Sequence, residues 1–268
     1  MNLSNENIAH KISGDVEFLE FKRLLEFEDL VHAFSLKPLN FRNKAGIESQ
    51  YEKFLNVLQI DSKALVKPTQ RHTANVIVLE NKQNNHEMDI NLEYLDGVDG
   101  IITNQKNIAL ATTSADCICI AFYDPIKKVI GNVHSGWRGT FQKIASIAVS
   151  KMISTYNCNP SDILAFMMPG IRKCHFEVDS DVKEECEKIF GYTCRLNEII
   201  ETGRVLNGIQ KYNIDCFLIN KILLENMGLL KENIYDSGIC SFCSSRKINS
   251  RRADGESFAL GTTVVMMK

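Results

Sequence analysis

No charge of one sign dominates this sequence, and no long apolar run interrupts it. Its 268 residues carry 31 Lys and Arg against 33 Asp and Glu, a formal net charge of −2 at pH 7. Such a balance gives no electrostatic attraction to nucleic acid or to an anionic membrane surface, so we expect neither as a partner. No segment approaches the roughly 18 apolar residues of a membrane span, and the first residues lack the basic start and apolar block of a signal peptide. We therefore expect a soluble, cytoplasmic protein.

Proline is also scarce, and nothing in the sequence resembles a linker. There are five prolines, and we find no Pro/Gly-rich stretch, low-complexity tract or internal repeat. With 44% apolar residues the chain can bury a sizeable core. The sequence therefore predicts a single domain over residues 1–268.

Helical and strand periodicities are mixed along the chain. Segment 49–60 places Tyr51, Phe54 and Leu58 on one helical face, whereas segment 75–80 is a short β-rich run. Because the two kinds of segment do not alternate strictly, we expect an α+β fold with mixed β-sheets rather than a doubly wound one. Strands are expected at 30–36, 75–80, 99–104, 117–124, 127–134, 163–170, 233–240 and 259–267, and helices at 49–60, 140–153, 179–190 and 214–228.

Cysteine is the abundant reactive residue, with nine in the chain. Without a leader sequence these are best interpreted as reduced thiols, most of them small core residues. Cys240 and Cys243 form a Cys-x-x-Cys pair with no second pair and no His-rich partner segment, so we interpret the pair as structural. We expect His175, which follows Cys174, to be a partly buried strand residue.

A cysteine and a histidine are brought together by a predicted hairpin. Asp124 to Lys127 contains Pro125 at the second position of a type I turn. If these four residues close the hairpin, the residue numbers of each directly opposed pair add up to about 251. Cys117 then lies directly opposite His134, with Cβ atoms about 4.5–5.5 Å apart. A thiol and an imidazole at that separation can share a metal ion or a proton. Cys119 then points to the same face, farther along the strand and in the core.

His72 is a third candidate, because it precedes a β-rich run and has polar neighbours. Two histidines and a cysteine make a suitable set for a catalytic zinc, which usually keeps a fourth position open for water. These ligands disfavour magnesium or calcium and admit zinc or copper. The alternative chemistry is a nucleophilic pair, with Cys117 as thiolate and His134 as base. Spacing alone does not attach His72 to the other two.

Five short motifs, in the order in which they follow one another along the chain, resemble those of the laccase-domain (multicopper polyphenol oxidoreductase) family. Family members are described mostly as purine nucleoside phosphorylases with adenosine deaminase activity, and some as peptidoglycan editing factors. The matching motifs are Gln70-Arg71-His72, Ser114-Ala115-Asp116-Cys117, His134-Ser135-Gly136-Trp137-Arg138-Gly139, Ile171-Arg172-Lys173-Cys174 with Glu177-Val178, and Arg251-Arg252-Ala253-Asp254-Gly255.

The resemblance implies a four-layer α/β/β/α fold and a zinc ion held by His72, Cys117 and His134. It implies small-molecule substrates, namely phosphate and a purine nucleoside such as adenosine, inosine or methylthioadenosine, and it leaves the oligomeric state open. Arg138 is then a candidate phosphate clamp at the strand–helix junction, aided by backbone N–H groups of the helix that follows. Asp116 is a candidate proton carrier in deamination, or a residue that orients a histidine.

The motifs depart from the family pattern around the substrate. Lys37 stands where an arginine is expected, and a lysine offers a point charge without a bidentate fork. We therefore expect phosphorolysis to be weaker than in relatives. Arg251 remains a substrate-binding candidate, although Ala253 is an insertion in its motif and a later arginine of the family is missing.

Four functions remain open at this point. The first is a zinc-dependent purine nucleoside phosphorylase and adenosine deaminase, with Cys117, His134 and Asp116 as catalytic residues. The second is an amidase that edits peptidoglycan precursors. A copper oxidase of phenols is the weakest, because six histidines are too few for a type 1 centre and a trinuclear cluster. The fourth is a non-enzymatic binding role.

Overall fold

A computed structural model describes residues 1–42, 46–80 and 95–268 of the chain. The first of its sheets has six strands. In spatial order they are β1 (Ile8–Ser13), β2 (Val16–Phe21), β3 (Leu30–Ser35), β15 (Gly261–Met267), β7 (Ala109–Ser114) and β4 (Leu65–Val66). All neighbours pair antiparallel except β4 and β7, which are parallel, so the sheet is mixed.

The second sheet is also six-stranded and mixed. Its strands, in spatial order, are β14 (Ile234–Asp236), β10 (Leu164–Met167), β8 (Ile118–Asp124), β9 (Val129–Ser135), β6 (Gly100–Thr103) and β5 (Val76–Val78). The outer pairs β14–β10 and β5–β6 are parallel and the inner pairs are antiparallel. The expected α+β class with mixed sheets is therefore confirmed.

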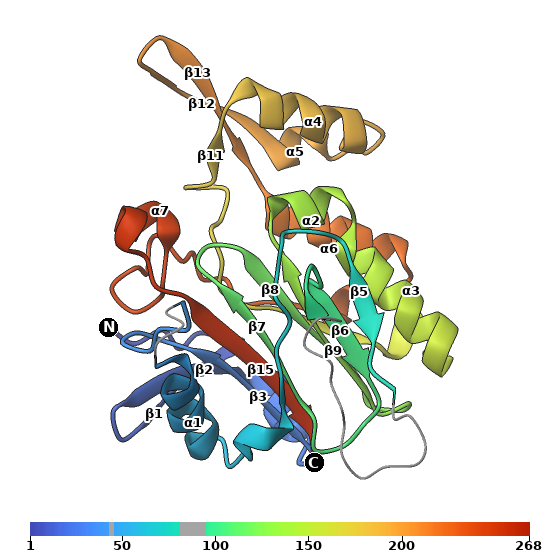
Figure 1. The fold of residues 1–268 in the computed structure, drawn as a ribbon. Helices are drawn as coiled ribbons and strands as arrows, with labels where there is room; N and C mark the ends of the chain where they lie inside the picture. The colour runs from blue at the N-terminus through green and yellow to red at the C-terminus, as the bar shows by residue number, and fades with distance from the viewer. Residues whose placement is uncertain (43–45, 81–94) are drawn as a thin grey trace.

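Helices cover the outer faces of the two sheets (Figure 1). On the first sheet lies α1 (Ile47–Val57), whose buried Tyr51, Phe54 and Leu55 contact the sheet as its helical periodicity predicts. On the second sheet lie α2 (Trp137–Phe141), α3 (Ile144–Tyr156) and α6 (Cys216–Asn226). Between the sheets is a core that includes Phe21, Phe34, Tyr123 and Phe166. The layers follow the order helix, sheet, sheet, helix.

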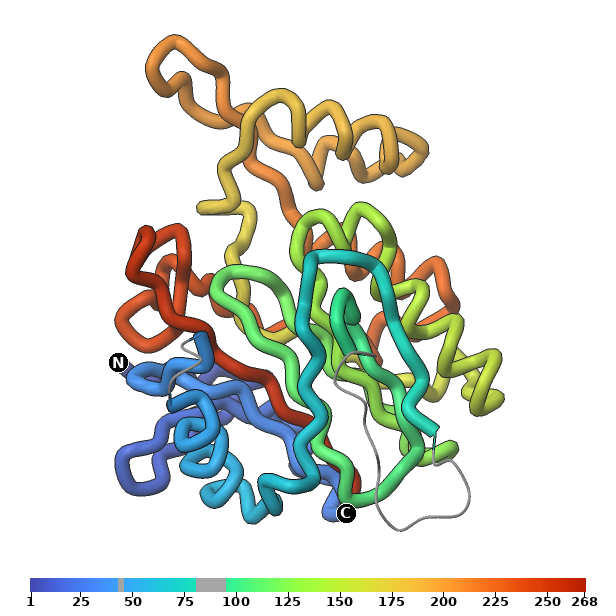
Figure 2. The backbone as a smooth tube through the Cα atoms, in the orientation of Figure 1, coloured from blue at the N-terminus to red at the C-terminus, as the bar shows by residue number. Residues whose placement is uncertain are grey.

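A smaller unit stands away from these layers. It contains α4 (Ser180–Phe190), α5 (Leu196–Ile199) and a three-stranded sheet of β11 (Glu177–Val178), β13 (Ile209–Ile214) and β12 (Ile200–Leu206). Figure 2 shows that the chain enters this unit just before β11 and leaves it through β13. We name it the projecting unit. The apolar pattern predicted α4 but not the β12–β13 hairpin.

Two further expectations need correction. The helix expected over 140–153 is split, because Lys143 adopts a left-handed φ of 63° between α2 and α3. The β8–β9 hairpin closes with a longer loop: Asp124 pairs with Val129, and His134 faces Cys119 rather than Cys117. The carboxylate of Asp124 accepts hydrogen bonds from the backbone N–H groups of Ile126 and Lys127 and so stabilises this wider loop.

The last short helix, α7 (Arg251–Asp254), carries part of a predicted motif. Across the described residues, we find no helix with the length and apolarity needed to cross a membrane.

Candidate active site and metal centre

His72, Cys117 and His134 come together where the chain passes between the two sheets. His72 lies in the link from β4 to β5 with a left-handed φ of 60°. Cys117 lies in the link from β7 to β8, and His134 is the penultimate residue of β9. One ligand atom from each lies within 4.8 Å of the others. Cys117 Sγ is 3.9 Å from His72 Nε2, and the two imidazole centroids are 4.9 Å apart.

The register predicted for Cys117 was wrong, although its thiol does lie close to His134. The pairing shifts by two residues, and a shift of two keeps each side chain on the same side of the sheet. Cys119 is fully buried in the core between the sheets, as expected. Cys117 lies one residue before β8, so the link itself turns its thiol toward His134.

Asp99 organises the site from behind. Its side chain is fully buried and lies 2.8 Å from His134 Nδ1. Its two oxygens also accept hydrogen bonds from the backbone N–H groups of Arg71, His72 and Thr73. Because Nδ1 of His134 is engaged by this carboxylate, Nε2 is the atom left for a ligand. Asp99 thereby fixes one histidine directly and positions the loop that carries the other.

The charges of Cys117 and His134 stabilise each other. Burial opposes ionisation of the thiol, but the charge and hydrogen bonding of His134, with a smaller contribution from His72, lower the pKa of Cys117 to about 6. Burial likewise opposes protonation of His134, but Cys117 and Asp99 raise its pKa to about 10. A thiolate and an imidazolium therefore face each other at neutral pH, and a divalent cation can replace the proton between them.

Glycines allow the close approach of the backbone at this site. A Cβ atom on Gly136 would lie 3.0 Å from His72 Cδ2 and 3.1 Å from Cys117 Sγ. A Cβ atom on Gly139 would lie 3.1 Å from the carbonyl oxygen of Thr73. Gly136 thus lets the chain pass over the ligand side chains, and Gly139 lets α2 pack on the loop that carries His72.

His72 and Cys117 line a cavity of about 600 Å³, and the buried His134 lies next to them. That volume lies within the range of about 300–1,000 Å³ typical of small-molecule sites. Its walls combine apolar and aromatic side chains with four arginines and a single carboxylate. The arginines are Arg71, Arg138, Arg251 and Arg252, and the carboxylate belongs to Asp116. This excess of positive charge favours an anionic ligand or co-substrate.

Several predicted site residues line this cavity. Arg138 lies with its guanidinium 4.2 Å from the ring centroid of Trp137. Arg251 lies across the cavity on α7. Asp116, with a left-handed φ of 89°, accepts hydrogen bonds from Ser241 Oγ at 2.6 Å and from the backbone N–H of Arg252 at 2.8 Å. It therefore ties the cavity wall to the C-terminal segment, whereas the carboxylate that orients a histidine is Asp99.

Of the three predicted substrate-binding residues, Arg138 and Arg251 line the cavity and Lys37 does not. Its ammonium forms an ion pair with Asp254 at 2.8 Å and donates to the carbonyl oxygen of Ser245 at 2.8 Å. The helix expected to support Arg138 is also short, since α2 has five residues. The guanidinium of Arg138 lies over the ring of Trp137.

Sequence reasoning missed Asp99, Arg71, Arg252 and Phe176. Asp99 had one signal, an acidic residue directly before an apolar strand, but this was interpreted as part of a turn. Arg71 and Arg252 are neighbours of residues that the motifs did identify. Phe176 lies in the link to the projecting unit, so its place on the cavity wall depends on tertiary structure alone.

Sequence comparison finds clear relatives. The profile of a family described as "Multi-copper polyphenol oxidoreductase laccase" matches residues 39–268. Purine nucleoside phosphorylase LACC1 of Homo sapiens is 32% identical over 177 residues, which are 65% of this chain and 39% of that protein. Purine nucleoside phosphorylase YlmD of Bacillus subtilis is 33% identical over 60% of this chain and 55% of its own length. The alignments thus span only about two fifths to half of these relatives.

A third relative carries a different name, and two solved structures share the fold. Adenosine deaminase RL5, from an unknown prokaryotic organism, is 30% identical over 74% of this chain and 73% of its own. The crystal structure of Bacillus licheniformis protein YfiH superposes with a TM-score of 0.84 at 22% identity, covering 97% of this chain and 99% of that one. YlmD from Geobacillus stearothermophilus gives a TM-score of 0.84 at 21% identity, covering 97% of this chain and 98% of its own.

Proposed function

Because the chain belongs to the multi-copper polyphenol oxidoreductase laccase family, which its residues 39–268 match, we propose that it is a zinc-dependent purine nucleoside phosphorylase with adenosine deaminase activity. The proposed nucleosides are adenosine, inosine and methylthioadenosine. The proposal rests on one observation above all: His72 and Cys117, which lie beside His134, line a cavity together with four arginines. We further propose that residues 1–268 act as one catalytic domain in the cytoplasm.

The donor set fits zinc. Two imidazole nitrogens and one thiolate are ligands that zinc prefers, and three protein ligands leave a position open toward the cavity. The Asp99 carboxylate behind His134 is the kind of partner that fixes a metal-binding histidine. When bound, zinc would supply a Lewis acid at this wall of the cavity.

The name of the family suggests copper, but other histidines lie away from this site. His32 is buried and accepts a hydrogen bond from the backbone N–H of Phe21, and His10 contacts Glu17. Among the histidines in the part of the chain that the structure describes, only His72 and His134 belong to this cluster. One mixed Cys–His site does not provide the ligands of a type 1 centre and a trinuclear cluster.

Phosphorolysis requires an anion to be held close to the anomeric carbon of the sugar while positive charge develops there. Arg138 and Arg251 are the residues we propose for phosphate, since both line the cavity and neither forms an ion pair with a carboxylate of the described residues. Trp137 and Phe176 offer aromatic surface to a purine. Lys37 contributes only indirectly, by fixing α7 through Asp254.

Deamination needs proton transfer near C6 of the base. Asp116 lines the cavity next to Cys117, and Ser241 together with the Arg252 backbone fixes the direction of its carboxylate. We therefore propose Asp116 as the proton carrier of this second activity.

The test is a product analysis on protein of measured metal content. Adenosine is incubated with and without phosphate, and adenine and inosine are separated. We expect adenine only when phosphate is present and inosine in both cases. Cys117→Ala should abolish both products, whereas Cys194→Ala, at an exposed thiol in the projecting unit, should leave them unchanged. Zinc-loaded protein that turns over no nucleoside would exclude the proposal.

The lowered pKa of Cys117 favours a second candidate, a cysteine-dependent amidase acting on muropeptides. Its nucleophile would be the same thiolate that binds zinc. Added zinc should therefore inhibit an amidase, whereas it should be required for nucleoside turnover. Measurement of both reactions before and after chelation separates the two.

A further inference from the structure

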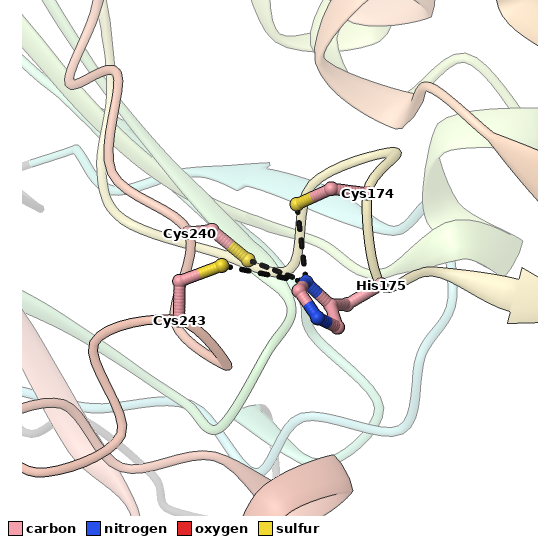
Figure 3. Close-up of side chains that lie close together, drawn as sticks. All are labelled: Cys174, His175, Cys240 and Cys243. Atoms are coloured by element: carbon pink, nitrogen blue, oxygen red, sulfur yellow. Dashed lines mark hydrogen bonds between the residues drawn. The ribbon is translucent and has the colours of Figure 1, made fainter.

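A second group of soft ligands lies outside the cavity. Cys174 and His175 belong to the turn before β11, and Cys240 and Cys243 belong to the turn after β14. The four ligand atoms lie within 4.8 Å of one another. Figure 3 shows the three sulfur atoms converging on one ring nitrogen of His175. The two turns are 65 or more residues apart in sequence, which is why the Cys-x-x-Cys pair alone seemed to lack partners.

Hydrogen bonding cannot account for this arrangement. His175 Nδ1 lies 3.2 Å from Cys174 Sγ, 3.4 Å from Cys243 Sγ and 3.9 Å from Cys240 Sγ. A ring nitrogen has either one proton to donate or one lone pair to share, so it satisfies one of the three thiols. All nine cysteines are free thiols in the structure, so no disulfide explains the convergence.

A tetrahedral cation accounts for the same distances. Zn–N of about 2.0–2.1 Å and Zn–S of about 2.3 Å at the tetrahedral angle separate nitrogen from sulfur by about 3.5 Å. The three observed separations fall on both sides of this value. Three thiolates and one imidazole form a closed set of four, which is typical of structural rather than catalytic zinc.

We propose that Cys174, His175, Cys240 and Cys243 bind a second, structural zinc ion. The site would join the turn that leads into the projecting unit to the C-terminal segment. The two turns already touch through the backbone, since the N–H of Ser241 donates to the carbonyl oxygen of Gly170 at 3.0 Å. His175 also stacks on Phe242, with ring centroids 4.1 Å apart, which holds the imidazole in place.

The second site adjoins elements of the cavity wall. The guanidinium of Arg252 donates to the carbonyl oxygens of His175 and Glu177, at 2.9 and 3.1 Å. Ser241, between the two cysteines of the pair, donates to Asp116. Zinc at this site would therefore hold in place the turn next to Phe176 and the segment that anchors Asp116. The inference does not depend on the proposed nucleoside chemistry.

The test combines metal analysis with variants of each site. Wild-type protein purified under reducing conditions should contain two zinc ions per chain, and so should the Cys194→Ser control. Cys117→Ser should contain one, held by the second site. The Cys240→Ser, Cys243→Ser double variant should also contain one, held by the first site.

Cobalt substitution identifies which ligands remain. Cys117→Ser loaded with Co²⁺ keeps three thiolates, and the double variant keeps one, so the thiolate-to-cobalt absorption should be about three times stronger in Cys117→Ser. If the double variant fails to fold, Cys117→Ser alone decides the matter. A Cys117→Ser protein without metal, a double variant that binds as much zinc as the wild type, or a disulfide among these cysteines in the reduced protein would each overturn the proposal.

Discussion

At the scale of single residues, Asp99 determines whether the first metal site is preformed. Its carboxylate meets the imidazole of one ligand and the backbone of the loop that carries another. Burial opposes its ionisation, but hydrogen bonding to His134 and to the backbone of Thr73 and Arg71 outweighs burial and lowers the pKa of Asp99. The carboxylate is therefore charged at neutral pH and balances the positive charge of His134.

Replacing Asp99 should weaken zinc binding without removing a ligand. We expect Asp99→Asn to bind zinc about 10- to 100-fold more weakly, because an amide cannot accept all the bonds that the carboxylate accepts and carries no charge. Competition with a chelator of known affinity measures the change. Asp96→Asn is the matched control, since Asp96 is exposed and, among the charged side chains that the structure describes, forms an ion pair with Arg71 alone. An unchanged affinity in Asp99→Asn would exclude this role.

At the scale of elements, local sequence patterns gave most strands and helices but not the loops that set the site geometry. Apolar runs predicted β8, β9 and α6. The predicted register of the hairpin was wrong because one side-chain oxygen of Asp124, Oδ1, accepts hydrogen bonds from two backbone N–H groups in a longer loop, which a turn motif does not reveal. The contacts of Asp99 with His134, and of Cys174 with Cys243, depend on chain paths that spacing does not encode.

The pairing of β2 with β3 contains a histidine whose titration should be visible in stability. His32 is fully buried, and its Nε2 accepts a hydrogen bond from the backbone N–H of Phe21 at 2.7 Å. Burial lowers the pKa of His32 to about 3. The unfolded state therefore binds a proton near its ordinary pKa of about 6.5 while the folded state does not, so stability falls as pH decreases below that value.

Because only the unfolded state binds this proton, we expect His32 to lower the free energy of unfolding by about 2 kcal/mol as the pH falls from about 7 to about 5. His32→Gln keeps an acceptor for the Phe21 N–H but does not titrate. The free energy of unfolding that this variant loses over the same pH range should therefore be smaller by that amount. Urea unfolding of both proteins at the two pH values measures the difference. Equal pH dependence in the two proteins would show that His32 titrates normally.

At the scale of the whole molecule, the proposed centres lie at junctions between parts of the fold. In the first, His72 and Cys117 come from links between the two sheets and His134 from the end of β9. The ligands of the second join the projecting unit to the C-terminal segment. The sequence motifs predicted the residues of the first centre. The layers explain why residues far apart in sequence meet there: β7, β8, β4 and β5 carry the chain from one sheet to the other.

The central claim is that the His72–Cys117–His134 centre converts purine nucleosides. Its most direct test is a zinc titration of metal-free wild-type protein beside Cys117→Ser, with phosphate-dependent release of adenine from adenosine measured at each point. We expect the wild-type rate to rise with added zinc until both sites are filled, at two equivalents per chain, and Cys117→Ser to stay inactive. Full activity without zinc, or no adenine at full occupancy of the first site, would contradict the claim.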